Sequence, residues 1–351
     1  MFKAASDSAH TEYRARLQLV NKPLKFGIDY LDDSLRGIFP DDLVLLGAPP
    51  GIGKTQFCCN LAYANLCDGK TVHYIALEAA QFEIERRLKW PLVMDAYYAD
   101  ENRPSLGKIE YTDWLMGKFG VEMEKYEMIA ADYFASAYRG LHIYYKSDKF
   151  DVGDLIEAVG YCANKTDLIM IDHVHYFDYD DDNENRAIKK IAKTVRTLAL
   201  EEQKPIFLVA HLRKRDRGND ELTAGLDEFH GSSDLYKIAT RVITFSPGKM
   251  VEPGKYETYF RIAKNRLDGG VIRFIGREIF SAQKGGYEKG QYRIGWANST
   301  RKDGFVEIEP GARPSWARES SACGGGAPAI PERTSPVFKP SRRPPNYAPV
   351  D

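Results

Sequence analysis

The chain has 351 residues, of which 43% are hydrophobic, so it can form one large or two ordinary domains and global disorder is excluded. A formal net charge of −1 excludes polyanion binding through overall charge, so a nucleic-acid site would have to be a local basic patch. The five cysteines show no zinc spacing, and no apolar run reaches the roughly 18 residues that cross a bilayer.

An α/β rhythm runs through most of the chain. Residues 1–23 form a charged arm, in which Tyr13, Leu17 and Val20 have the spacing of a short amphipathic helix. From residue 24 to 300, apolar runs alternate with helical patterns, as in a mostly parallel sheet covered by helices on both faces. The expected strands are Leu43–Leu46, Val72–Leu77, Leu141–Tyr145, Leu168–Ile171, Ile206–Ala210 and Val242–Phe245, and the expected helices include Thr55–Cys67, Val152–Asn164 and Arg186–Glu202.

A phosphate-binding loop follows the first expected strand and opens a helix. Gly51 and Gly53 let backbone N–H groups face an anion, and the helix presents its positive end to it. Lys54 would reach the β- and γ-phosphates of ATP, and the Thr55 hydroxyl would ligate Mg²⁺. An ordinary Gly/Pro turn is the alternative. The residues assigned to nucleotide binding here are Ala48, Pro49, Pro50, Gly51, Ile52, Gly53, Lys54 and Thr55.

Carboxylates follow two other expected strands. Glu78 ends the second apolar run, and Asp172 ends the run Leu168–Ile171. Ligands of parallel sheets bind outside the carboxyl ends of the strands, so both carboxylates are expected beside the phosphate-binding loop. Asp172 would hold the magnesium shell and Glu78 would orient or deprotonate the attacking water. A strand-end cap for Asp172 and a helix-terminal role for Glu78 are the alternatives.

A basic, glycine-containing stretch follows the strand Ile206–Ala210 and runs to about His230. Its cationic residues suit phosphate contacts without sequence preference, so they are the candidate DNA-binding residues, with a solvated loop as the alternative. They are Arg213, Lys214, Arg215 and Arg217. The segment from Asp178 to Glu184 is acidic and is not expected to bind phosphates directly.

The end of the chain changes in composition. Thr258–Ala263 and Val271–Ile275 are expected to extend the sheet as a hairpin. Nine of the 18 prolines lie at or after Pro310, so residues 301–351 are expected to be a disordered tail.

Several of these motifs, in this order, resemble the ATPase domain of DnaB-type replicative helicases. The resemblance covers roughly residues 24–285 and is carried by Phe26–Asp32, Asp42–Leu46, the phosphate-binding loop, Ala76-Leu77-Glu78 and Arg86-Arg87-Leu88. Ile171-Asp172-His173 and Ala210–Lys214 resemble the helicase half of phage primase-helicases and of the Twinkle type.

The resemblance implies a RecA-like fold and further site residues. It makes Glu78 the catalytic base and His211 the sensor of the γ-phosphate, against the alternative of an ordinary strand-end histidine. It also implies that Lys264 and Arg266 enter the nucleotide site of a neighbouring subunit, where an arginine stabilises developing charge. Without the resemblance, these two cations would be a solvated strand end.

The resulting hypothesis is a ring-forming, expected hexameric, Mg·ATP-dependent helicase that translocates on single-stranded DNA. The sequence shows no primase or zinc-ribbon segment and has no room for a helical amino-terminal collar. The expected helicase is therefore a minimal one, or its collar and primase are separate chains, and a primase or a loader is a candidate partner. The odd cysteine count and the lack of a signal-peptide pattern favour the cytoplasm of a bacterial or phage-infected cell. A RecA/RadA-like recombinase and a regulatory or loader ATPase without unwinding activity remain alternatives.

Overall fold

A computed structural model of the chain describes residues 23–267 except 81, 147, 180–182, 213–228 and 230–233. It also describes residues 6, 11, 13 and 14 and the segments 275–281, 285–288, 295–297 and 305–307. The chain divides into two units, residues 1–310 and 311–351, of which the second lies outside the described residues. No helix in the described ranges is both long and apolar enough to span a membrane.

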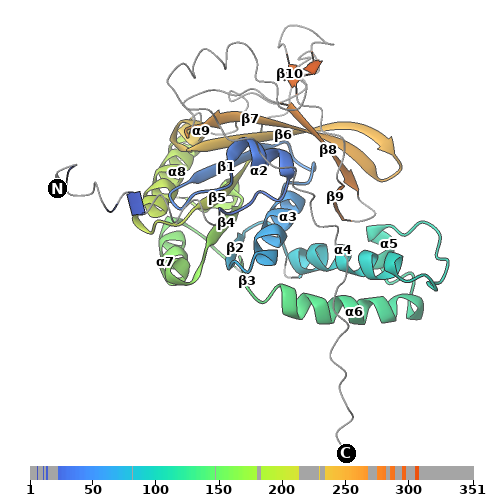
Figure 1. Ribbon diagram of the computed structural model, residues 1–351. Helices are drawn as coiled ribbons and strands as arrows, with labels where there is room; N and C mark the ends of the chain where they lie inside the picture. Colours follow the sequence, from blue (N-terminus) through green and yellow to red (C-terminus); the bar gives the residue numbers. More distant parts are fainter. Residues whose placement is uncertain are drawn as a thin grey trace, which may run out of the picture. The chain divides into compact units, whose positions relative to one another are not determined.

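One mixed sheet organises the first unit (Figure 1). Its order is β11-β10-β8-β7-β6-β1-β5-β4-β2-β3, and β9 pairs with β8. The strands from β6 to β3 in this order are mutually parallel, and the remaining pairings are antiparallel. The strands are β1 (Leu43–Ala48), β2 (Val72–Ala76), β3 (Leu141–Tyr145), β4 (Leu168–Asp172), β5 (Ile206–His211), β6 (Arg241–Glu252), β7 (Lys255–Asn265), β8 (Ile275–Ser281), β9 (Gly286–Glu288), β10 (Gly295–Ala297) and β11 (Phe305–Glu307).

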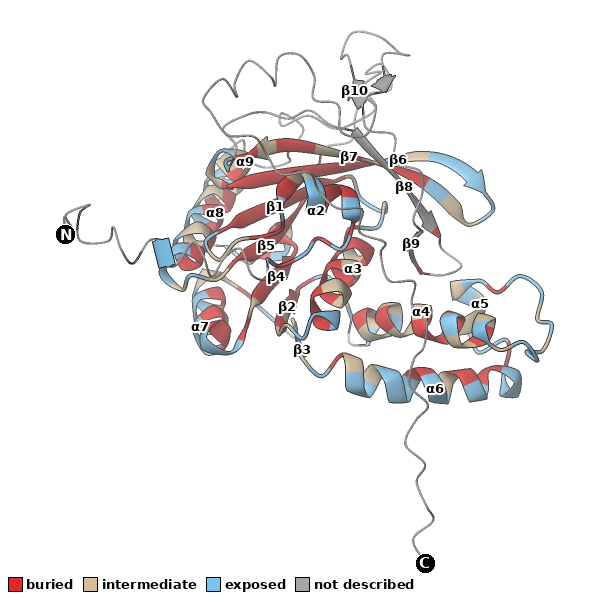
Figure 2. Ribbon diagram, in the orientation of Figure 1, coloured by how far each residue is buried: buried red, intermediate tan, exposed pale blue. Residues whose placement is uncertain are grey.

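Helices cover both faces of the parallel part of the sheet. Val44 and Leu46 of β1 pack in a cluster with residues of α3, whereas Leu43 and Leu45 pack with residues of α7 and α8. Because successive strand residues point to opposite faces, a continuous apolar run supplies both clusters (Figure 2). The helices are α2 (Asp29–Leu35), α3 (Lys54–Cys67), α4 (Glu83–Ala99), α5 (Tyr111–Leu115), α6 (Val121–Ala137), α7 (Val152–Cys162), α8 (Glu184–Glu201) and α9 (Asp234–Ile238).

Local sequence explains where the two helices on one face begin and how they pack. Asp151 caps α7, because its carboxylate accepts from the N–H groups of Gly153 and Asp154. The Asp154 carboxylate accepts in return from the Asp151 N–H. Asn183 caps α8 in the same sense by accepting from the Arg186 N–H. The buried residues of α8 recur at helical spacing: Ala187, Ile188, Ile191, Ala192, Val195, Leu198 and Ala199.

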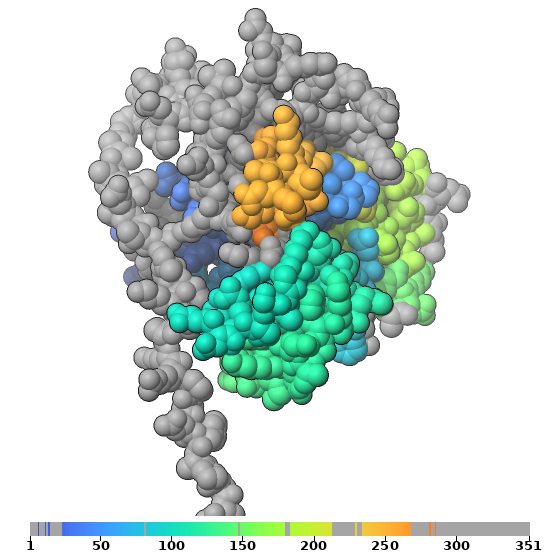
Figure 3. Space-filling model, turned by 90° about the vertical axis from the view of Figure 1, so that its right-hand side faces the viewer, coloured from blue at the N-terminus to red at the C-terminus, as the bar shows by residue number. Residues whose placement is uncertain are grey.

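A helical excursion separates β2 from β3. Helices α4, α5 and α6 gather in one lobe, which lies in front of the β6–β7 hairpin and below it (Figure 3). Trp90 of α4 is 2% exposed and packs against Tyr111 and Trp114, with ring centroids 5.7 and 5.2 Å away. The lobe therefore has aromatic packing of its own.

The expected α/β fold with a mostly parallel central sheet is confirmed. The strand Leu141–Tyr145 has the expected bounds, and β1, β2, β4 and β5 differ from expectation by at most two residues at one end. The strand expected at Val242–Phe245 continues as β6 to Glu252, turns through Pro253-Gly254 and pairs with β7. The expected hairpin partner of β7 is β8, which begins at Ile275, while 271–274 lie outside the described residues.

The expected arm and tail lie largely outside the described residues. Within residues 301–351, β11 at Phe305–Glu307 pairs with β10. The boundaries of the arm, the ATPase domain and the tail stay predictions.

A buried ion pair joins the start of β6 to the segment before β1. Arg241 is 1% exposed, its Nε lies 3.2 Å from the Asp42 carboxylate, and its Nη1 donates to the carbonyls of Leu35 and Gly37. The Asp42 carboxylate also accepts from the Phe39 N–H and the Thr240 hydroxyl. These contacts of the guanidinium tie α2 and the following turn to the sheet.

Replacing Arg241 by Met is expected to lower the free energy of unfolding by about 3–5 kcal/mol, because the Asp42 carboxylate stays buried without its cation. Chemical denaturation measures the change. The control is Lys108→Met, which removes the exposed pair with Glu110 and should cost no more than about 1 kcal/mol. Equal losses of stability in both variants would show that Arg241 is not a structural cross-link.

Candidate active site

The loop after β1 has the backbone of an anion site. Gly51 and Gly53 adopt φ values of 77° and 93°, a left-handed conformation that favours glycine. A Cβ at Gly51 would meet no atom within 4 Å, so this glycine serves the backbone conformation rather than space. Gly53 precedes α3 and offers no side-chain cap, so the first N–H groups of α3 are left for another acceptor.

Lys54, the first residue of α3, folds back over this loop. Its side chain is largely buried, and its Nζ donates to the Pro49 carbonyl at 3.2 Å and lies 2.9 Å from His211 Nδ1. Burial lowers the pKa of the Lys54 ammonium, while the charges of Asp172 and Glu78 act in the opposite direction. A partly desolvated cation at this place is suited to attract an anion.

Asp172 is buried at the end of β4 and is held through one oxygen. Its Oδ2 accepts from the Thr55 hydroxyl at 3.0 Å and the Tyr74 hydroxyl at 2.9 Å. Burial raises the pKa of the Asp172 carboxyl, and these two hydrogen bonds oppose that rise. Its Oδ1 is also buried but has no hydrogen-bond partner among the described residues.

This donor set fits a magnesium ion. The ion prefers hard oxygen ligands, and the Thr55 hydroxyl and the Asp172 carboxylate supply them next to the loop. The unpartnered Asp172 Oδ1 would gain a partner in a bound cation or in its water shell. Thr55 and Asp172 are therefore the residues that would hold the metal.

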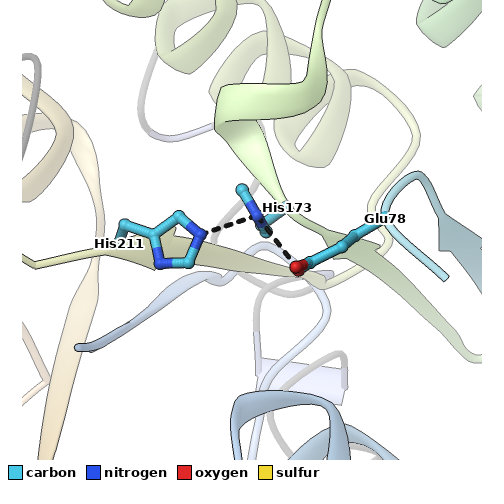
Figure 4. A group of neighbouring side chains, drawn as sticks. All are labelled: Glu78, His173 and His211. Carbon is cyan, nitrogen blue, oxygen red and sulfur yellow. Dashed lines mark hydrogen bonds and ion pairs between the residues drawn. The ribbon is translucent and has the colours of Figure 1, made fainter. Parts of the chain in front are cut away.

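Glu78, His173 and His211 form a connected row (Figure 4). His173 Nε2 lies 3.2 Å from Glu78 Oε2 and 2.8 Å from His211 Nε2. His173 is 1% exposed, and burial, followed by the neighbouring histidines, lowers its pKa to about 2, so its imidazole is neutral. Burial and the charge of Asp172 raise the pKa of Glu78, whose side chain is 44% exposed.

Strand register explains why residues so far apart in sequence meet. Ala48 pairs with His211 between β1 and β5, and Ala76 pairs with Asp172 between β2 and β4. The carboxyl ends of β1, β2, β4 and β5 therefore share one edge of the sheet, as expected for parallel strands. The structure thus brings together the loop residues, Glu78, Asp172 and His211.

Lys264 and Arg266 lie at the opposite edge. Asn265 of β7 pairs with Arg241 of β6, which pairs with Val44 near the amino end of β1. Lys264 Nζ donates to the carbonyls of Tyr236 and Lys237 at the end of α9, and Arg266 is exposed. The structure therefore does not bring these two residues to the loop of their own chain.

The four candidate DNA-binding residues, Arg213, Lys214, Arg215 and Arg217, lie outside the described residues. The same holds for residues 180–182 of the acidic segment. Asp178 of that segment pairs with Lys146 at 2.7 Å and accepts from the Phe150 N–H, which are contacts within the fold.

Two site residues were missed by sequence reasoning. Tyr74 carried a signal, because a tyrosine in a continuous apolar strand needs a partner for its hydroxyl, but the sequence does not name that partner. His173 follows Asp172, and nothing in its sequence position shows that its side chain turns towards Glu78 and His211.

Comparison with known proteins gives a consistent family. The family model of the DnaB-like helicase C terminal domain matches residues 24–273. The chain is 25% identical over 245 residues to the replicative DNA helicase DnaB of Buchnera aphidicola subsp. Schizaphis graminum, a match that covers 62% of the chain and 49% of that protein. The chain thus spans about half the length of this curated relative.

Two solved structures share the fold. A DnaB-like replicative helicase, described with its interactions with primase, has a TM-score of 0.65 and 16% identity, covering 82% of this chain and 67% of that one. The ATPase domain of G40P has a TM-score of 0.66 and 16% identity, covering 83% of this chain and 100% of that one. With the family model matching most of the chain, the protein belongs to the DnaB-like helicase C-terminal domain family.

Proposed function

We propose that the chain is the ATP-hydrolysing motor of a replicative DNA helicase, which works as a ring on single-stranded DNA. The observation that carries the proposal is the shared edge where an uncapped helix terminus, Lys54, the Thr55–Asp172 pair and Glu78 converge. Membership of the DnaB-like family supports the choice of a DNA motor over other phosphate-loop enzymes.

The chemistry assigned to this edge is hydrolysis of the γ-phosphate bond of ATP. Lys54 and the first N–H groups of α3 bind the phosphates, and Glu78 orients the attacking water and takes up its proton. His211 contacts the γ-phosphate as a sensor. Thr55 and Asp172 would hold magnesium, which would neutralise charge on the phosphate oxygens. Tyr74 fixes the Asp172 carboxylate through its hydroxyl.

The proposed site is completed by a neighbouring subunit. Arg266 follows β7 at the amino end of β1, whereas the phosphate-binding loop follows the carboxyl end. A six-residue strand spans about 20 Å, which is too far for Arg266 to reach its own loop. A ring therefore lets Lys264 and Arg266 of one chain face the nucleotide of the next, and hydrolysis then depends on assembly.

The proposed partners are single-stranded DNA and further copies of the chain, with a hexamer as the expected ring. The DnaB-like helicase of known structure was described with primase, so a primase on a separate chain is also proposed as a partner. The DNA contacts are assigned to Arg213, Lys214, Arg215 and Arg217, because a basic loop binds phosphates without reading sequence.

Lys54→Ala is expected to abolish ATP binding, because the phosphates lose their buried cation. Glu78→Gln should bind ATP but hydrolyse it slower by a factor of about 10² or more. Nucleotide fluorescence and phosphate release measure the two steps, and Glu101→Gln, an exposed carboxylate, serves as control. Hydrolysis by Glu78→Gln at the parent rate would assign the base elsewhere.

Arg266→Ala is expected to bind ATP as the parent does but to hydrolyse it about 10³-fold slower, because every site lacks its neighbour's guanidinium. Mixing this variant with Lys54→Ala creates interfaces with one intact loop and one intact arginine, so part of the activity should return. Arg139→Ala, another exposed arginine, should behave as the parent. If mixed rings form and activity stays absent, Arg266 does not act across the interface.

DNA binding is expected to weaken with salt and to be indifferent to base sequence. Neutralising Arg213, Lys214, Arg215 and Arg217 together should flatten the slope of log affinity against log salt by about 0.7 for each DNA phosphate that the variant no longer binds. Fluorescence anisotropy with labelled oligonucleotides measures the slope, and neutralising Arg342 and Arg343 in the tail is the matched control. An unchanged slope in the loop variant would place the DNA site elsewhere.

A further inference from the structure

Three contacts between described residues bring hydrogen-bond donors to the nitrogens of His173 and His211. The His175 backbone N–H donates to His173 Nδ1 at 3.3 Å, so this nitrogen carries no proton. A neutral His173 then has its single proton on Nε2, which faces both Glu78 and His211. His173 can therefore donate to either neighbour, and it has only one proton to give.

A neutral His211 also has a single ring proton, and both of its ring nitrogens face another residue. Lys54 Nζ lies 2.9 Å from His211 Nδ1, and an ammonium group can only donate. If Nδ1 accepts from Lys54, a neutral His211 carries its proton on Nε2, and two N–H groups then face each other across 2.8 Å. A second proton on His211 would add a positive charge beside Lys54. The contacts Lys54–His211 and His211–His173 thus exclude each other as hydrogen bonds.

A transition-metal ion bound by these residues would not remove the conflict between the hydrogen-bond donors. Glu78, His173 and His211 each offer one ligand atom, all within 4.8 Å of one another. A histidine that binds a metal through Nε2 carries its proton on Nδ1 and normally donates it to an acceptor. Here both Nδ1 atoms face donors, the Lys54 ammonium and the His175 N–H. The cluster is therefore better suited to exchanging hydrogen bonds than to ligating a metal.

We propose that His173 is a positioning residue that donates its Nε2 proton to Glu78 when Lys54 contacts His211, and to His211 when ATP draws Lys54 away. The proposal rests on the function proposed above, in which Lys54 and His211 contact the γ-phosphate. It deepens that function by naming how occupancy of the phosphate site regulates the catalytic carboxylate.

The protein differs between the two states in the tautomer of His211 and not in net charge. Without nucleotide, Lys54 donates to His211 Nδ1, His211 is protonated on Nε2, and His173 donates to Glu78. With ATP, Lys54 donates to the phosphates and His211 exchanges its Nε2 proton with solvent for one on Nδ1, which donates to the γ-phosphate. His211 Nε2 then accepts from His173, and Glu78 is released to bind water. ADP offers no γ-phosphate to accept a proton from His211 Nδ1, so His211 keeps its proton on Nε2 and Glu78 stays held.

A double-mutant cycle on nucleotide affinity tests this exchange without measuring hydrolysis. Glu78→Gln weakens the bond that ATP must break, so it should tighten binding of the non-hydrolysable analogue AMP-PNP by about fivefold, the scale of a charge-assisted bond. His173→Asn keeps an acceptor for the His175 N–H but removes the bridging proton. In that background Glu78→Gln should tighten AMP-PNP binding by no more than it tightens ADP binding, because only the loss of its charge remains.

ADP and a distant histidine provide the controls. Glu78→Gln also removes a negative charge near the phosphates, but that effect on ADP affinity should be equal with and without His173. His142→Asn, on β3 in a ring stack with His73, should leave the fivefold effect intact. If His173→Asn does not fold, His211→Asn, in a less buried place, replaces it by removing the acceptor.

Two outcomes separate the claims. If Lys54→Ala abolishes AMP-PNP binding while Glu78→Gln has the same effect in both backgrounds, the nucleotide site stands and the exchange through His173 is wrong. If Lys54→Ala leaves AMP-PNP binding unchanged, the proposed nucleotide site itself is wrong.

Discussion

The parallel register of four strands is the constraint on which the site depends. Because β1, β5, β4 and β2 run in one direction, the residues that follow them emerge at one edge of the sheet. There Lys54 contacts His211, and Glu78 is linked to His211 through His173. Asp172 accepts from the hydroxyl of Thr55, the residue next to Lys54. At the far edge, the antiparallel β6–β7 pairing brings Arg266 to the other end of β1. One chain thus carries the two halves of a proposed site on opposite edges, an arrangement that a ring of identical chains can use.

Burial at the shared edge sets the electrostatics of the site before any ligand binds. Lys54 and Asp172 are largely removed from water, and their polar atoms are held by Pro49, Thr55 and Tyr74. Groups fixed in this way need little reorganisation when charge develops nearby. Among the described residues, Asp172 Oδ1 is a buried oxygen without a hydrogen-bond partner, and His173 Nε2 lies 2.8 Å from His211 Nε2. Both lie where ATP and magnesium are proposed to bind.

Much of the fold could be predicted because its signals are local. The apolar runs of β1, β2, β4 and β5 and the glycines of the loop depend on residues within a few positions. The helices α4–α6 were not among the predicted elements. The extension of β6 beyond Phe245 was also not predicted, because it contains polar residues and is explained by pairing with β7. Tyr74 acts through a partner 98 residues away, and His173 through partners 38 and 95 residues away, which spacing cannot reveal. The residues that could be predicted are therefore those with a motif, and those that could not are their supports.

The central claim is that this edge hydrolyses ATP in an assembly that works on DNA. The most direct measurement is the ATPase rate per chain as a function of protein concentration, with and without single-stranded DNA. The rate is expected to rise with protein concentration until the ring is formed, and to rise again when single-stranded DNA is added. A rate per chain that depends on neither concentration nor DNA would contradict the central claim.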